Sequence, residues 1–136
     1  MAEGLKGVLV DTSAWLEFLR DTRSPTARAL ERMIQEKEPM RISGLIVTEL
    51  LRGCPSEEDA AALAESLLAW PAVEPVYPST YEDAARLHRT ARSRGLTIRG
   101  TVDCVVAALA IEHGLAILHL DRDYAALRKI SALMIA

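Results

Sequence analysis

Short apolar segments alternate with helix-forming segments along this chain, and that order limits the possible folds more than any other feature. Five segments are predicted as strands: residues 7–10, 40–43, 73–77, 115–120 and 133–135. The third is the weakest because Pro75 interrupts it. Parallel strands need crossover connections, which are usually helices. The pattern therefore predicts an α/β fold, a three-layer α/β/α sandwich with a mainly parallel central sheet.

Cap residues place the predicted helices between these strands. Ser24 followed by Pro25 is a typical helix start. Thr80 and Thr101 are the predicted caps of two later helices. The predicted helices cover approximately residues 13–20, 25–38, 45–52, 56–70, 80–95, 101–114 and 121–128.

The chain has 136 residues, 50% of them hydrophobic, which is enough for one compact domain and too few for two. We therefore expect residues 1–136 to form a single domain. The longest apolar run, from Cys104 to Ile111, is far shorter than the roughly 20 residues of a membrane helix, and no secretory signal pattern is present. The expected location is the cytoplasm, with no membrane association. Neither the cysteines nor the histidines have the spacing of a zinc site, a disulfide framework or a histidine-dependent hydrolase.

Acidic residues stand where predicted strands end or predicted helices begin: Asp11, Glu49, Asp103 and Asp121, with Asp123 beside the last. Because the carboxyl ends of parallel strands share one edge of a sheet, these acids can converge there, where open α/β folds bind ligands. Gathered carboxylates repel one another unless a cation neutralises them. Oxygen ligands of this kind suit Mg²⁺ or Mn²⁺, which also bridge to phosphate oxygens. The pattern predicts metal-dependent phosphate chemistry.

The first two acids also have structural explanations. Asp11 can cap the helix that follows it, while Thr12 and Ser13 supply hydroxyls that either complete the cap or hold the carboxylate. Glu49 can pair with Arg52 on the next helical turn, although such a pair contributes only about 0.2 to 0.5 kcal/mol.

The later acids have similar alternatives. Asp103 suits the first turn of its helix whatever the function, because the helix dipole favours an anion there. Asp121 can cap the last short helix, and Asp123 can be its first-turn acid. Independent capping acids would fall on both edges of the sheet, whereas all of these are predicted on one edge, which favours a shared site.

The basic residues are segregated, although the net charge of −3 argues against a general nucleic-acid binder. Between residues 84 and 102 there are five arginines and no acid: Arg86, Arg89, Arg92, Arg94 and Arg99. This segment can be a solvated helix face, or it can hold a nucleic-acid backbone. The absence of acids within the segment favours the second interpretation.

Four segments carry a family resemblance: VLVDTSA at 8–14, VTELLRG at 47–53, DCVVAALA at 103–110 and LDRDY at 120–124. In their order and spacing they resemble the PIN-domain ribonucleases, and most closely the VapC toxins of bacterial toxin–antitoxin pairs. The likeness covers nearly the whole chain. Tyr124 stands where the family often has phenylalanine, a mild departure that does not affect the expected chemistry.

The resemblance implies roles for the site residues. The catalytic acids would be Asp11, Glu49, Asp103 and Asp121, all of them metal ligands, with Asp123 as the other candidate for the fourth acid. Thr12 or Ser13 would orient Asp11 or the attacking water.

The resemblance further implies a homodimer and a partner antitoxin whose C-terminal segment lies across the active-site groove. Apolar side chains of the first two helices are the expected antitoxin contacts: Trp15, Leu16, Leu19, Leu30, Met33 and Ile34. The alternative is that these residues are ordinary core.

The resulting hypothesis is an endoribonuclease toxin that uses Mg²⁺ or Mn²⁺ to hydrolyse phosphodiester bonds of tRNA, rRNA or mRNA, and so inhibits translation or growth. Four arginines would hold the RNA backbone: Arg86, Arg89, Arg92 and Arg99. Two other functions stay open, a catalytically inert PIN-like module that binds protein or RNA, and a Mg²⁺-dependent receiver-like phosphoacceptor domain. The second expects adjacent acids after the first strand, whereas Asp11 has no acidic neighbour.

Overall fold

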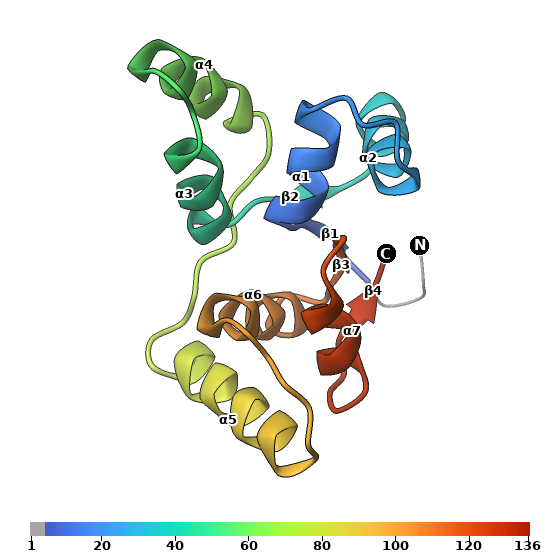
Figure 1. Ribbon diagram of the computed structural model, residues 1–136, viewed down its shortest axis with the longest axis vertical. Helices are drawn as coiled ribbons and strands as arrows, with labels where there is room; N and C mark the ends of the chain where they lie inside the picture. Colours follow the sequence, from blue (N-terminus) through green and yellow to red (C-terminus); the bar gives the residue numbers. More distant parts are fainter. Residues whose placement is uncertain (1–4) are drawn as a thin grey trace.

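A four-stranded sheet lies at the centre of the computed structural model, which describes residues 5–136 (Figure 1). The strands are β1 (Gly7–Val10), β2 (Met40–Arg41), β3 (Leu115–Leu118) and β4 (Met134–Ile135), in the spatial order β2-β1-β3-β4. Each neighbouring pair of strands is parallel. Every residue of β1 and β3 is buried, which explains why both are continuous apolar runs in the sequence.

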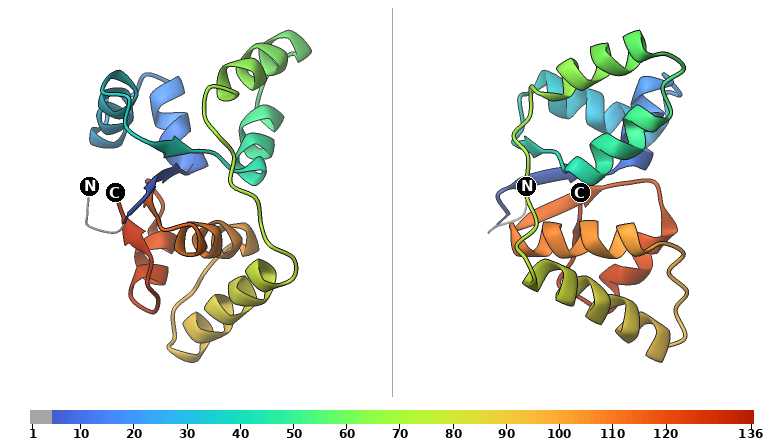
Figure 2. Two further views of the ribbon diagram at one scale, coloured as in Figure 1. Left: turned by 180° about the vertical axis from the view of Figure 1, so that it is seen from behind. Right: turned by 90° about the vertical axis from the view of Figure 1, so that its left-hand side faces the viewer.

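Helices cover both faces of this sheet (Figure 2). One layer holds α1 (Thr12–Leu19), α2 (Pro25–Gln35), α3 (Gly44–Arg52) and α4 (Glu57–Leu67). The other holds α5 (Ser79–Ser93), α6 (Thr101–Glu112) and α7 (Arg122–Arg128). The predicted three-layer α/β/α sandwich with a parallel sheet is confirmed. No helix among residues 5–136 has both the length and the apolar character needed to span a bilayer.

Helix α6 lies between the sheet and α5, and its composition reflects this position. It contacts β3 and α5, and Cys104 and residues 106–110 are buried. A helix enclosed in this way is apolar on most sides. Because α6 runs back to the start of β3, its own first turn, which carries Asp103, lies at the carboxyl edge of the sheet.

The strand predicted at residues 73–77 is wrong. An isolated bridge joins Ala72 to Ile42, and Val73 N donates to Ile42 O at 2.8 Å. Pro75 has no N–H and cannot continue a ladder, so the segment only connects α4 to α5. Strand β2 is also shorter than predicted, with 2 residues instead of residues 40–43.

Thr80 and Thr101 are not the helix caps predicted from the sequence. Helix α5 starts one residue before Thr80, and α6 starts at Thr101 itself with Gly100 in the cap position. The Thr80 hydroxyl is buried, where it accepts a hydrogen bond from Val76 N at 2.8 Å and donates to Glu112 Oε2 at 2.7 Å. It therefore joins α5 to the end of α6.

Candidate functional site

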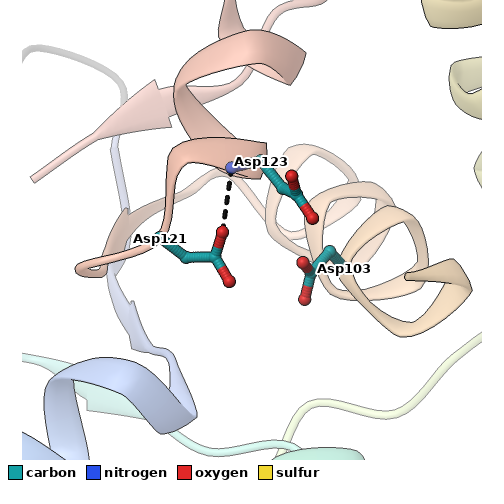
Figure 3. A group of neighbouring side chains, drawn as sticks. All are labelled: Asp103, Asp121 and Asp123. Carbon is teal, nitrogen blue, oxygen red and sulfur yellow. Dashed lines mark hydrogen bonds between the residues drawn. The ribbon is translucent and has the colours of Figure 1, made fainter. Parts of the chain in front are cut away.

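Three aspartates form a group, the three-aspartate cluster, beside the carboxyl end of β3 (Figure 3). Asp103 comes from the first turn of α6, whereas Asp121 caps α7 and Asp123 lies in its first turn. One carboxylate oxygen of each lies within 4.8 Å of those of the other two. Asp121 Oδ1 also accepts a hydrogen bond from Asp123 N at 2.9 Å. Capping and clustering are therefore compatible, since the capped turn brings both aspartates to Asp103.

Asp11 reaches the same edge of the sheet because β1 and β3 are parallel neighbours. Val10 pairs with Leu118, and Asp11 N donates to Leu118 O at 2.9 Å. The buried Asp11 carboxylate accepts hydrogen bonds at Oδ2 from Ser13 N at 3.1 Å and from Ser13 Oγ at 2.7 Å. Leu120 N in turn donates to Ser13 Oγ at 2.9 Å. Ser13 thus holds the Asp11 carboxylate and links α1 to the segment after β3.

The Tyr124 hydroxyl connects Asp11 to Asp103. It is fully buried, donates to Asp11 Oδ1 at 2.7 Å and lies 3.4 Å from Asp103 Oδ1. Burial, followed by the charges of Asp11 and Asp103, raises the pKa of this hydroxyl above its usual value, so it is a donor at physiological pH. The sequence marks Tyr124 only as a departure from a common phenylalanine. Its position directly after Asp123 is the signal that could have identified its role.

Glu49 is not part of the three-aspartate cluster but lies on the Asp11 side of the site. Its Oε1 accepts a hydrogen bond from Thr12 Oγ1 at 2.9 Å, and its Oε2 lies 4.0 Å from Arg52 Nη2. The ion pair with Arg52 is long and its Arg52 side chain is exposed, so it contributes little to stability. The two hydroxyls considered for Asp11 therefore have separate partners, because Ser13 holds Asp11 and Thr12 holds Glu49.

The electrostatics of the cluster fit a bound divalent cation. Burial and a hydrogen bond that its protonated form can make with Asp123, followed by repulsion from Asp121, raise the pKa of Asp103 to about 7. Asp123 is 2% exposed, and its Oδ1 has no hydrogen-bond partner among residues 5–136. A buried carboxylate oxygen without a donor is unfavourable unless a cation lies nearby, and the Arg99 guanidinium, with Nε 3.6 Å from this oxygen, offsets its charge only in part. The crowded acids and this oxygen together suit an ion such as Mg²⁺ or Mn²⁺.

Cys104 and His119 lie close to the aspartates but do not suit nucleophilic or acid catalysis. Burial, followed by the charge of Asp103, raises the pKa of the Cys104 thiol to about 11, so the thiol is protonated at neutral pH. Burial lowers the pKa of His119 despite the opposing effect of nearby aspartates. The imidazole is therefore mainly neutral at pH 7, and the chemistry of the site is that of its carboxylates.

The four arginines predicted to hold RNA lie in different environments. Arg99 contacts the cluster, with Nη2 3.2 Å from Asp121 Oδ1 and Nε 3.6 Å from Asp123 Oδ1. Arg86 on α5 pairs at 2.8 Å with Asp83, an acid just before the acid-free segment. The other two are exposed on α5: Arg89 and Arg92. Contact of all four with RNA stays a prediction.

Half of the apolar residues expected to contact an antitoxin are buried in the core. Trp15, Leu30 and Met33 are 2%, 0% and 5% exposed, so the expectation is corrected for these three. The physical reason is that α1 and α2 pack against each other and against the rest of the core, as the ordinary-core alternative requires. Leu16 and Ile34 are partly buried, and Leu19 is 45% exposed.

Known proteins share both the sequence pattern and the fold. The family model of the PIN domain matches residues 8–130. The ribonuclease VapC11 of Mycobacterium tuberculosis is 35% identical over 131 residues, which cover 95% of this chain and 97% of that protein. VapBC-1 from nontypeable Haemophilus influenzae aligns with a TM-score of 0.70 at 18% identity, over 95% of this chain and 96% of that chain. VapC20 of Mycobacterium tuberculosis, a sarcin–ricin loop cleaving toxin, aligns with a TM-score of 0.62 at 22% identity, over 88% of this chain and 93% of the VapC20 chain.

Proposed function

The chain belongs to the PIN-domain family, and within it to the VapC ribonucleases, and from this premise we propose that it is a metal-dependent endoribonuclease. The proposed reaction is the hydrolysis of RNA phosphodiester bonds. The observation that carries the proposal is the meeting of Asp103, Asp121 and Asp123, with the buried Oδ1 of Asp123 receiving no hydrogen bond among residues 5–136. Such a site offers oxygen ligands to a divalent ion and favours a reaction in which water attacks phosphorus.

The three-aspartate cluster would hold Mg²⁺ or Mn²⁺, and an ion of this kind supplies an activated water molecule and neutralises charge on the leaving oxygen. Asp11 lies beside the cluster with one carboxylate oxygen held by Ser13 and the other by Tyr124. In this position Asp11 can complete the ligand set or hold the attacking water in line with the phosphorus. Glu49, held by Thr12, would act on the same side of the site.

Exposed arginines on α5 would hold the RNA strand. Arg89 and Arg92 face solvent, where they can contact phosphates and so position the strand without reading its sequence. The proposed substrates are tRNA, rRNA or mRNA, and we place the activity in the cytoplasm, where these RNAs are found.

The protein is proposed to be the toxin of a toxin–antitoxin pair and a homodimer. The 35% identity to VapC11 and the fold shared with VapBC-1 support the role in a toxin–antitoxin pair, whereas the homodimer is proposed from the family resemblance alone. Leu16, Leu19 and Ile34 are the residues of the expected antitoxin surface that are not fully buried. Light scattering after size-exclusion chromatography tests the homodimer, and a mass of one chain at micromolar concentration would contradict it.

Cleavage of structured RNA tests the proposed reaction. The wild-type protein should cleave RNA in the presence of Mg²⁺ or Mn²⁺, and EDTA should stop the cleavage. Asp103→Asn keeps the shape of the side chain but removes the charge of a ligand. We expect this substitution to lower the cleavage rate by roughly 100-fold or more.

Asp59→Asn is the matched control. Asp59 is the third residue of α4, as Asp103 is the third residue of α6, but it is exposed and lies outside the cluster. This variant should cleave at the wild-type rate. Equal rates for the two variants, or full cleavage in EDTA, would remove the proposal.

A further inference from the structure

The Arg99 guanidinium forms ion pairs with two members of the three-aspartate cluster, Asp121 and Asp123. Its Nη2 lies 3.2 Å from Asp121 Oδ1, and its Nε lies 3.6 Å from Asp123 Oδ1. Among residues 5–136, no other basic side chain forms an ion pair with these aspartates. The Asp123 oxygen that faces Arg99 is the buried atom without a hydrogen-bond partner. The guanidinium therefore partly offsets the negative charge of the Asp123 carboxylate, which has no closer counterion among residues 5–136.

The main chain of Arg99 is held independently of its side chain. Arg99 N donates to Asp123 Oδ2 at 3.2 Å, so the residue stays beside the cluster wherever its guanidinium lies. The Arg99 side chain is 56% exposed, whereas that of Asp123 is 2% exposed. Solvent hydrates the exposed guanidinium when it leaves, whereas the buried Asp123 carboxylate needs another cation in its place. The guanidinium can therefore leave the carboxylates when a divalent ion replaces it, while its Cα remains in place.

We propose that Arg99 exchanges its anionic partner, leaving Asp121 and Asp123 for an RNA phosphate when a divalent ion binds the cluster. This inference rests on the proposed function, because it requires an ion and RNA at this site. A divalent ion on the same carboxylates repels the guanidinium and competes with it for Asp121 Oδ1. The displaced guanidinium is planar and suits paired hydrogen bonds to a phosphate.

The exchange couples the binding of the ion to the binding of RNA. Arg99 opposes the ion when RNA is absent, whereas bound RNA gives the displaced guanidinium a new partner. Each ligand therefore strengthens the binding of the other, as thermodynamic linkage requires. Loss of the guanidinium should strengthen ion binding alone and weaken RNA binding when the ion is present. A role for Arg99 in loop structure alone would produce neither effect.

Calorimetric titration with Mn²⁺ tests the first half of the exchange. Arg99→Gln removes the charge but keeps the main-chain hydrogen bond to Asp123, and it should bind Mn²⁺ roughly fivefold more tightly than wild type. Arg122→Gln is the matched control. Arg122 is exposed beside Asp121 and forms no ion pair among residues 5–136. This control measures the loss of one nearby charge and should change the Kd by less than about twofold.

Fluorescence anisotropy of a labelled RNA hairpin tests the second half. Binding is measured in Ca²⁺ and in EDTA, with the RNA checked on a gel to be intact. In Ca²⁺, Arg99→Gln should bind the hairpin roughly fivefold more weakly than wild type, because a phosphate contact is lost. In EDTA the difference between the two proteins should be less than about twofold, because the guanidinium stays on the aspartates.

The outcomes separate this inference from the proposed function. If wild type binds Mn²⁺ but Arg99→Gln binds it no more tightly than Arg122→Gln, the exchange is refuted and the proposed function stands. Equal loss of RNA affinity in Ca²⁺ and in EDTA also refutes the exchange. If wild type binds no Mn²⁺, the proposed function fails and the exchange fails with it.

Discussion

Replacing Tyr124 with phenylalanine removes one oxygen atom from the centre of the site and retains the buried ring. The hydroxyl donates to Asp11 Oδ1 at 2.7 Å. Asp11 is 5% exposed, so water cannot readily replace the lost donor. Hydrogen bonds to charged groups contribute about 1.5–3 kcal/mol. We therefore expect Tyr124→Phe to lower the free energy of unfolding by about 2 kcal/mol.

Urea denaturation in EDTA, followed by the fluorescence of Trp15 and Trp70, measures this loss. For a chain of 136 residues, it corresponds to a fall in Tm of about 8 °C. Tyr77→Phe is the matched control because Tyr77 is 84% exposed. Loss of that exposed hydroxyl should change the free energy of unfolding by less than about 0.5 kcal/mol.

A double-mutant cycle isolates the hydrogen bond between Tyr124 and Asp11. In the Asp11→Asn background the acceptor is neutral, so loss of the Tyr124 hydroxyl should cost about 1 kcal/mol less than in the wild-type background. The reasoning would be refuted if Tyr124→Phe lay within about 0.5 kcal/mol of wild type. The same loss in both backgrounds would also refute it, because the hydroxyl would then not stabilise the Asp11 carboxylate.

The ionisation of Asp103 and the backbone at Gly7 provide two further tests. Mn²⁺ binding needs the ionised Asp103, so its pKa of about 7 predicts an affinity about tenfold lower at pH 6 than at pH 8 by calorimetry. In EDTA the folded protein retains a proton that the unfolded chain releases near pH 3.8. The stabilisation that comes from this proton on Asp103 is therefore complete below pH 3.8 and is lost as the pH rises through about 7. The urea midpoints of Asp103→Asn should lack this pH dependence. Gly7→Ala should lower the free energy of unfolding by about 1–3 kcal/mol, because φ is +152° and the added Cβ would lie 2.8 Å from Pro39 O. Gly44→Ala, with no atom within 4 Å of the added Cβ, should be neutral or stabilising in the same urea assay. A Kd for Mn²⁺ that does not vary with pH would contradict the prediction for Asp103. Equal stability of Gly7→Ala and Gly44→Ala would contradict the prediction for Gly7.

The sheet and its acidic edge are predictable because local signals coincide there. Strands β1 and β3 are apolar at every residue, and each is followed closely by a residue that caps a helix, Asp11 after β1 and Asp121 after β3. Parallel pairing then brings both carboxylates to one edge without any further information. The sequence places the hydroxyls of both Thr12 and Ser13 beside Asp11 but leaves open which of them holds its carboxylate, and the structure assigns that role to Ser13.

Contacts between distant segments are the part of the site that the sequence does not predict. Tyr124 and Asp11 are 113 residues apart, and Arg99 and Asp121 are 22 apart. Such pairs depend on how α6 and α7 pack against the sheet, and no periodicity along the chain reports that geometry. The sequence leaves open for the same reason whether Trp15 contacts an antitoxin or lies in the core, because helical spacing shows an apolar face but not what covers it.

The binding of one divalent ion by Asp103, Asp121 and Asp123 is tested most directly by a crystal grown with Mn²⁺. Anomalous diffraction at the manganese absorption edge locates the ion independently of any activity. We predict a peak about 2.0–2.4 Å from a carboxylate oxygen of Asp103 and from an oxygen of Asp121 or Asp123. A peak bound elsewhere, or no peak at saturating Mn²⁺, would contradict the proposed metal site and with it the nuclease mechanism.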